Sequence, residues 1–246
     1  MEVALAAEKI FSIGPIPVTN SILTTWIVTA ILITFAFLAT RKITPVPQGL
    51  QNIAEVAIDN LQDLVSSVAG EKTKVFLPII ASFFFFILIG NYFGLLPGVG
   101  TIGFFSMHEG KEVFIPLFRS INSDLNTTAA LALVSVVTTH YLAVKYLGLK
   151  NYLGKFFSLH PIFLFVGLLE LVGEATKVLS LSFRLFGNIF AGEVLLSTAS
   201  AKIFAFIVPI PFYFLELLVG FVQALIFAML TLVFMVILTE KHAAEH

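Results

Sequence analysis

Five long apolar stretches constrain the fold of this 246-residue chain more than any other feature. They occupy residues 21–40, 75–96, 126–146, 160–196 and 212–239. A helix of ~20 predominantly apolar residues is long enough to cross a hydrocarbon core ~30 Å thick. Hydrophobic residues make up 58% of the chain and charged residues 12%, which excludes a soluble or a disordered protein. The sequence therefore predicts an all-α polytopic membrane protein, a single membrane domain over residues 1–246 with about five crossing helices.

Residues 47–70 have a different pattern from the crossing segments. Their apolar residues recur at three- and four-residue steps, with polar residues on the other side, which predicts an amphipathic helix lying on the membrane surface. Glu55, Asp59 and Asp63 form an acidic edge on it. That edge is either a solvated face or a docking face for another subunit. Residues 99–122 are expected to form a loop.

The last two apolar stretches are longer than a perpendicular crossing requires. Residues 160–196 would form a helix ~55 Å long, which favours a steep tilt or packing against a curved partner. With a loop over residues 197–211, the two stretches predict a hairpin of two long, tilted C-terminal helices.

The basic residues favour one orientation in the membrane. The start of the chain contains acids and prolines where a signal peptide would be basic and then apolar, so the first span is expected to be retained. With the N-terminus outside and the C-terminus inside, eight basic residues are cytoplasmic and four are outside, which agrees with the positive-inside rule. The cytoplasmic eight are Arg41, Lys42, Lys72, Lys74, Lys145, Lys150, Lys155 and Lys241, and the outer four are Lys9, Lys111, Arg119 and Lys202.

No motif of the sequence points to a cofactor, a metal or a nucleic acid. Cysteine is absent and the five histidines are scattered. Gly98, Gly100 and Gly103 match a dinucleotide-binding pattern, but an apolar helix precedes them where that motif needs a strand. No glycine-rich loop with a lysine for ATP phosphates occurs. The net charge of −1 gives no electrostatic case for a nucleic-acid partner.

Ionisable residues inside the fourth stretch are the candidates for function. Inserting one such charged group at bilayer depth costs ~2.5–3.5 kcal/mol of free energy, so its presence there indicates a functional role. At ~100° per residue, five polar residues of this stretch share a stripe roughly 80° wide, whereas Glu193 falls on another side. The stripe consists of Glu170, Glu174, Lys177, Arg184 and Asn188.

The fifth stretch adds Glu216 and Gln223, two turns apart on one helix face. Antiparallel pairing with the fourth stretch places Glu193 and Glu216 at a similar shallow depth, and Arg184 and Gln223 near the middle of the membrane. The polar groups either pair with one another to join two helices or line a polar route. Arg184 has no well-placed acid on its own helix, which predicts an acidic partner on another chain.

At these residues the sequence resembles a known family. The segment Ser180-Leu-Ser-Phe-Arg184-Leu-Phe-Gly-Asn188-Ile-Phe-Ala-Gly-Glu193 is similar to the signature of the a subunit of F-type ATP synthases. Gln223-Ala-Leu-Ile-Phe227 resembles the second signature of that family. The similarity covers essentially the whole chain, including Pro45-Val-Pro-Gln-Gly49, Asn91-Tyr-Phe-Gly-Leu-Leu-Pro97 and Asp124-Leu-Asn126-Thr127.

The resemblance implies a proton-channel stator that is not itself an enzyme and binds no cofactor. It would face a rotating ring of c subunits, supply it with protons through two offset half-channels, and assemble with b subunits and the rest of the ATP synthase. Arg184 would be essential, meeting the ring carboxylate. Asn188, Glu193, Glu216 and Gln223 would line the outer half-channel, and Glu174, Lys177 and Ser180 would lie toward the cytoplasmic route.

Many members pair an acid with a histidine at the two positions where this chain has Glu193 and Glu216. The expected location is a bacterial plasma membrane rather than a thylakoid. A secondary transporter that binds its substrate at the same stripe would show an internal repeat, and the two halves show none. A membrane-embedded enzyme would need a metal cluster or a nucleophile beside a base, and the sequence offers neither.

Overall fold

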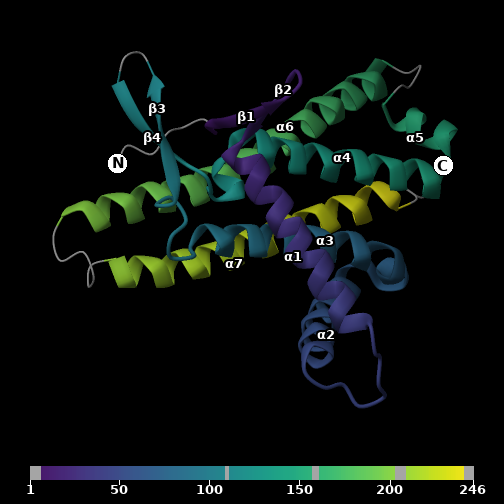
Figure 1. Ribbon diagram of the computed structural model, residues 1–246. Coiled ribbons are helices and arrows are strands. Elements are labelled where there is room, and N and C mark those ends of the chain that lie inside the picture. The colour runs from purple at the N-terminus through teal and green to yellow at the C-terminus, as the bar shows by residue number, and fades with distance from the viewer. Residues whose placement is uncertain (1–6, 109–110, 157–160, 203–208, 241–246) are drawn as a thin grey trace.

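The structure is a computed structural model that describes residues 7–108, 111–156, 161–202 and 209–240 (Figure 1). This part of the chain is mostly helical, with two short antiparallel hairpins. The helices are α1 (Asn20–Thr40), α2 (Leu50–Ala69), α3 (Thr73–Gly94), α4 (Leu125–Leu147), α5 (Leu149–Phe156), α6 (Pro161–Lys202) and α7 (Pro209–Thr239). The strands are β1 (Lys9–Ile13), β2 (Ile16–Thr19), β3 (Gly103–His108) and β4 (Lys111–Pro116), and the single 3-10 turns are η1 (Gly70–Lys72) and η2 (Ile121–Ser123).

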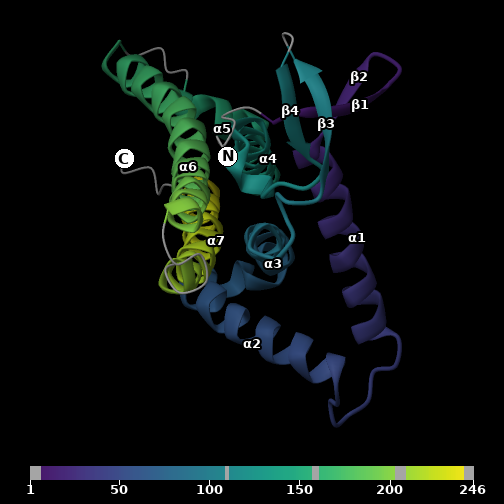
Figure 2. The ribbon, with the colours of Figure 1, turned by 60° about the vertical axis from the view of Figure 1, so that its left-hand side comes forward.

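Helices α3, α4, α6 and α7 pack alongside one another at the centre of the molecule (Figures 1 and 2). Helix α7 contacts each of the other three, and its Ala224, Phe227, Ala228 and Leu232 are buried. Small residues on such a face let helix backbones approach closely, which is how helices associate in lipid. This packing places the charged residues of α6 beside α7.

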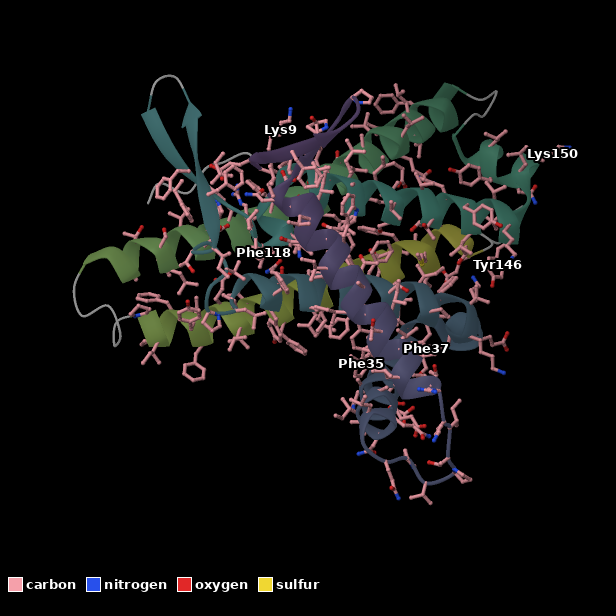
Figure 3. All side chains as sticks on the ribbon, in the orientation of Figure 1. Lys9, Phe35, Phe37, Phe118, Tyr146 and Lys150 are labelled. Atoms are coloured by element: carbon pink, nitrogen blue, oxygen red, sulfur yellow. The ribbon has the colours of Figure 1, made fainter. Side chains whose placement is uncertain are left out.

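Helix α1 crosses the outside of this bundle, and its far end meets α2 (Figure 2). Its apolar side chains are largely exposed: Ile33 is 65% exposed and Phe37, labelled in Figure 3, is 61% exposed. Five helical stretches of the described residues are long and apolar enough to cross a membrane. The predicted class, an all-α polytopic membrane protein, is confirmed, and lipid is the solvent that such exposed side chains require.

Helix α2 begins three residues after the predicted start at residue 47. Gly49 precedes it with a φ of 58°, a conformation that glycine adopts without strain. Leu61 and Val65 are buried on the side that packs against α3 and α7, whereas Asp59 and Asp63 of the acidic edge are exposed. The helix therefore packs on the bundle through Leu61 and Val65, while Leu50, Ile53 and Leu64 are exposed. On the acidic edge, Glu55 is half-buried and accepts from the side-chain amide of Gln51 at 2.7 Å.

The expected loop over residues 99–122 contains the β3–β4 hairpin, and a second hairpin, β1–β2, precedes α1. The segment expected as a loop therefore contains two paired strands, which the sequence analysis did not predict. Phe104, Phe105, Phe114 and Ile115 supply the aromatic and β-branched side chains that favour strands. Both hairpins lie at the same end of α1 (Figure 1), so they cover one end of the membrane domain.

The two long helices extend beyond their predicted ends. Helix α6 continues to Lys202 instead of ending at residue 196, and α7 starts at Pro209 instead of residue 212. Proline suits a first helical turn because its missing N–H needs no partner there. The predicted start at His160 lies outside the described residues. Residues 197–202 and 209–211, which were expected to belong to the loop, are thus helical.

Replacing Lys72 with methionine should destabilise the C-terminal end of α7. The Lys72 ammonium donates to the carbonyl of Thr239 at 3.0 Å and to its hydroxyl at 2.9 Å. A cation at this position also suits the negative end of the helix dipole. We expect a loss of about 1–2 kcal/mol, or a few degrees in the melting temperature of the detergent-purified protein. Lys74→Met removes an exposed charge two residues away, and an equal loss in that variant would contradict the capping role.

Candidate functional site: two cavities along helix α6

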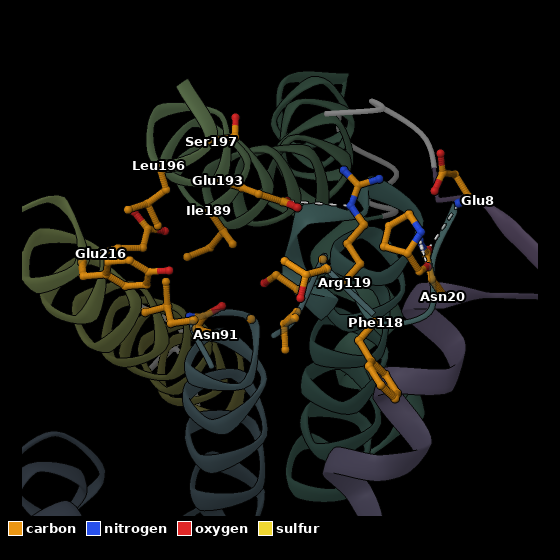
Figure 4. Close-up of a pocket in the computed structure, with 18 of the residues that line it drawn as sticks. Glu8, Asn20, Asn91, Phe118, Arg119, Ile189, Glu193, Leu196, Ser197 and Glu216 are labelled. Carbon is orange, nitrogen blue, oxygen red and sulfur yellow. Dashed lines mark hydrogen bonds and ion pairs between the residues drawn. The ribbon is translucent and has the colours of Figure 1, made fainter. Parts of the chain in front are cut away.

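A cavity of about 440 Å³ lies between the bundle and the hairpin end of the molecule (Figure 4). We call it the glutamate cavity, because Glu193 of α6 and Glu216 of α7 both line it. The N-terminal segment contributes a further acid, Glu8, and the segment after β4 contributes Arg119. Glu193 and Glu216, which the sequence places at a similar depth, therefore both lie in the wall of one cavity.

The two glutamates have different surroundings. Glu216 is 5% exposed, and its carboxyl group packs so closely against Gly192 that a Cβ atom there would overlap it. Glu193 is 32% exposed and points toward Arg119, whose Nε lies 3.8 Å from its Oε2 (Figure 4). One acid is thus enclosed between α6 and α7, and the other faces a cation across the cavity.

Arg119 was expected only as an outer loop residue. It is 4% exposed, and its guanidinium donates to the hydroxyl of Ser123 at 2.9 Å and to the carbonyl of Ser123 at 3.2 Å. Sequence reasoning missed this residue because it lies outside every apolar stretch. The signal that could have found it is its position five residues before Asp124, which caps α4 by accepting from the Asn126 amide.

Buried amides fix the helices around the glutamate cavity. Asn91 of α3 lines the cavity and donates to the carbonyl of Gly220 on α7 at 2.9 Å. Asn122 of η2 donates to the Asn91 side-chain oxygen at 2.7 Å. These bonds connect α3, α7 and η2, and buried polar groups satisfied in this way rigidify the site. They hold the turn of α7 that follows Glu216.

A second cavity, of about 460 Å³, lies further toward the start of α6. We call it the arginine cavity, because Arg184 lines it together with Lys177, Ser180 and Thr176 of α6. Leu230 and Phe234 of α7 complete its wall. No residue lines both cavities; Arg184 is the last α6 residue of the arginine cavity, and the α6 residues of the glutamate cavity begin at Ile189.

The Arg184 side chain is exposed on α6. Its Nη2 atom lies 3.5 Å from the Ser180 hydroxyl, one helical turn away. No carboxylate of the described residues forms an ion pair with it. Because an unpaired guanidinium at membrane depth is costly, this geometry agrees with an acidic partner on another chain.

The rest of the predicted stripe is divided between a local cluster and isolated positions. Glu174 accepts from Lys177 at 2.6 Å, so the pairing that the sequence left open is present. Glu170 is half-buried on α6, whereas Asn188 is exposed and Gln223 of α7 is half-buried. Asn188 and Gln223 are not among the residues that line the two cavities.

His140 of α4 and Tyr152 of α5, which the sequence did not suggest, extend the Glu174 cluster. The His140 Nε2 atom lies 3.4 Å from Glu174, and its Nδ1 atom lies 2.7 Å from the Tyr152 hydroxyl. Burial raises the pKa of Tyr152 above its usual value, and the negative charges of Glu174 and Glu170 raise it further. The hydroxyl therefore stays protonated at physiological pH and joins α5 to α4 through His140, which in turn contacts Glu174 of α6.

These features define a class of protein before any comparison. The chain is a polytopic helical membrane protein whose ionisable side chains line separate cavities, an arrangement typical of proteins that pass ions or substrates. Among the described residues, no three His, Asp or Glu side chains lie close enough together to hold a metal ion.

Comparison with known proteins identifies the family. The family model described as ATP synthase A chain matches residues 22–236. The chain is 34% identical over 230 residues to "ATP synthase subunit a" of Syntrophobacter fumaroxidans, covering 92% of this chain and 87% of that protein. It is 32% identical over 234 residues to the protein of the same name from Moorella thermoacetica, covering 95% and 97%. The chain therefore belongs to the family of a subunits of F-type ATP synthases.

Proposed function

We propose that this chain is the proton-translocating stator subunit of the membrane Fo sector, and that it supplies a c-subunit ring with protons through two offset half-channels. The observation that carries the proposal is the pair of separate cavities along α6, with Arg184 in the wall of one of them. Family membership supports the same role. In this role the chain is a channel subunit rather than a catalytic one.

In this proposal the glutamate cavity is the outer half-channel. Protons reach Glu193 and Glu216 and pass toward the ring along Asn188 and Gln223. The enclosed position of Glu216 suits an acid that holds a proton and then releases it, because burial disfavours a bare carboxylate. Phe114 and Pro116 of β4 form part of the wall of this cavity.

Arg184 is the residue at which the proton path changes direction. A ring carboxylate that faces lipid must be neutral, because an isolated charge there is prohibitive. Near the permanently charged guanidinium the ionised carboxylate is favoured, so the proton is released into one half-channel. The same fixed charge blocks a direct proton leak past it. Each proton is driven by ~2.3 kcal/mol per 100 mV of membrane potential.

The arginine cavity is the cytoplasmic half-channel. Lys177 and Ser180 line it beside Arg184, and Glu174 neutralises Lys177. With this assignment the N-terminus is outside and the C-terminus inside, in the plasma membrane of a bacterium. The exposed Asp59 and Asp63 of α2 then face the cytoplasm, where they would bind b subunits of the peripheral stalk.

Gly192→Ala should impair proton flow through the glutamate cavity. The added Cβ atom would overlap the Glu216 carboxyl and force it to move. We expect ATP-driven proton pumping by inverted vesicles to fall about tenfold, which corresponds to ~1.4 kcal/mol. Gly154→Ala on α5 has open space around its Cβ and is the matched control. Unchanged pumping by fully assembled Gly192→Ala complexes would argue against a role for the Glu216 position.

The experiment that tests the proposed function removes the chain and restores it. The gene for this chain is deleted in the cell that normally produces it. Inverted membrane vesicles from the deletion strain should no longer acidify when ATP is added, although the soluble ATPase head still hydrolyses ATP. Supplying the chain should restore acidification, and purification in mild detergent should recover it with a ring of small proteolipids. Undiminished acidification without the chain would refute the proposal.

A further inference from the structure

The corner between α4 and α5 is a surface that the proposed function does not use. Gly148 joins the two helices with a φ of 80°. The Tyr152 hydroxyl lies within hydrogen-bond distance of His140, at 2.7 Å, and Asn151 donates to the carbonyl of Leu147 at 3.0 Å. These contacts hold α5 against α4, at the end of α4 that lies away from the β3–β4 hairpin (Figure 1). The side chains of this corner therefore have a fixed arrangement.

Exposed side chains form an inclined row along α4 that ends at this corner. Residues four positions apart lie on one ridge of a helix, and Leu133, Val137, Tyr141 and Lys145 are all exposed. Along the row, aliphatic side chains are followed by a tyrosine that is 66% exposed and then by a lysine. Membrane helices show the same order, because tyrosine lies at the level of the headgroups and lysine extends toward the lipid phosphates. The row thus indicates that α4 reaches the membrane surface at this corner.

Helix α5 continues the row beyond the corner. At ~100° per residue, Leu149 and Leu153 share one face of α5, with Tyr152 on one flank and Lys150 on the other. Both leucines are exposed, and Figure 3 shows Lys150 at the outer edge of the molecule, pointing away from the bundle. Exposed leucines beside a lysine are typical of a helix that lies in the interface of an anionic membrane.

The positive charge of the corner is not neutralised within the described part of the chain. Lys145 and Lys150 are exposed, and neither forms an ion pair with a described carboxylate. On the neighbouring α6, Glu174 is occupied by Lys177 and His140. Two ammonium groups beside exposed leucines therefore remain available to an anion from outside the chain.

We propose that the α4–α5 corner binds an anionic phospholipid, with its phosphate facing Lys145 and Lys150 and its acyl chains along the exposed apolar side chains of α4. A phospholipid fits better than an acidic protein segment, because the row that leads to the lysines starts with aliphatic side chains at membrane depth. An anionic membrane attracts each nearby lysine by an amount that corresponds to about a fivefold change in binding. The site lies apart from both cavities, so the proposal does not rest on the proton path.

The test measures which lipid touches the corner in the purified complex. The complex is placed in bilayers that contain photoreactive phosphatidylglycerol or, in a parallel sample, photoreactive phosphatidylcholine. After illumination, lipid adducts on residues 133–153 are counted by mass spectrometry. With the original chain, we expect about 25-fold more adduct from phosphatidylglycerol, since two lysines each contribute about fivefold. Equal yields from the two lipids would overturn the proposal.

Variants of the lysines assign this preference to the corner. Lys145→Gln and Lys150→Gln should each lower the preference about fivefold, and the double variant should abolish it. Lys145→Arg keeps the charge and should keep the preference. Lys42→Gln removes an exposed lysine just beyond α1 and is the matched control. An unchanged preference in the double variant, or an equal loss in Lys42→Gln, would refute a site at this corner.

Two further measurements test the other possible occupants. A photoreactive amino acid in place of Leu153 should form adducts with lipid, and adducts with another subunit instead would show that protein covers the corner. Inorganic phosphate in excess should not reduce the phosphatidylglycerol adducts, because it lacks acyl chains. A reduction would assign the corner to a free anion. Either of these outcomes would overturn the proposal, and neither depends on whether the complex pumps protons.

Discussion

Replacing Arg184 with lysine should abolish coupled proton pumping. Lysine keeps a positive charge at neutral pH in water, but it can lose its proton in a poorly hydrated site and lacks the planar guanidinium fork. The ring carboxylate would then be neutralised less reliably and the barrier to a direct leak would be lost. We expect the rate of ATP-driven acidification of inverted vesicles to fall by about 100-fold or more. A rate loss of this size is typical when one charge-stabilising group is removed from a reacting centre.

Arg41→Lys is the matched control, because Arg41 is exposed just beyond the end of α1. That variant should pump like the original chain. Assembly is checked by the amount of c-ring that co-purifies with each variant. If the Arg184→Lys complex assembled fully and pumped at the original rate, the central role given to Arg184 would be wrong.

Glu216→Gln should have an effect of comparable size. Glutamine has nearly the same shape, so the packing against Gly192 is kept while the ability to take up and release a proton is lost. A positioned proton-transfer group contributes about 100-fold or more to a rate. Proton-driven ATP synthesis in liposomes should therefore fall by roughly that factor, with a normal amount of assembled complex.

Glu240→Gln provides the comparison for Glu216→Gln. Glu240 follows α7 and is exposed, outside both cavities. Its replacement should leave synthesis unchanged. Normal synthesis by Glu216→Gln would show that protons bypass Glu216, and the glutamate cavity would then need another acceptor.

The apolar stretches predicted the helices well, because ~20 apolar residues have few alternatives to a membrane-crossing helix. The hairpins were missed for a physical reason. Strands such as Gly103–His108 are short and their hydrophobic pattern is weak beside the neighbouring spans. The ends of α6 and α7 were also misjudged, since Pro209 and Pro211 suggest a turn although proline is equally suited to the first turn of a helix.

The site was predictable where it follows helical periodicity. The spacing on α6 and α7 brought Glu193 and Glu216 to one level, and both line one cavity. Arg119 and His140 could not be found in this way. Arg119 reaches the cavity from a segment between β4 and η2, and His140 reaches Glu174 from α4. Contacts between residues on different elements depend on the tertiary packing, which periodicity within one helix does not describe.

The central claim is that the two cavities open to opposite sides of the membrane and meet only at the ring. The chain contains no cysteine, so single cysteines report accessibility without a background. Ser197 lines the glutamate cavity and Thr176 lines the arginine cavity. In the assembled complex, a membrane-impermeant thiol reagent should label Ser197→Cys only from outside and Thr176→Cys only from the cytoplasmic side. Labelling of both positions from the same side would contradict the two-half-channel account.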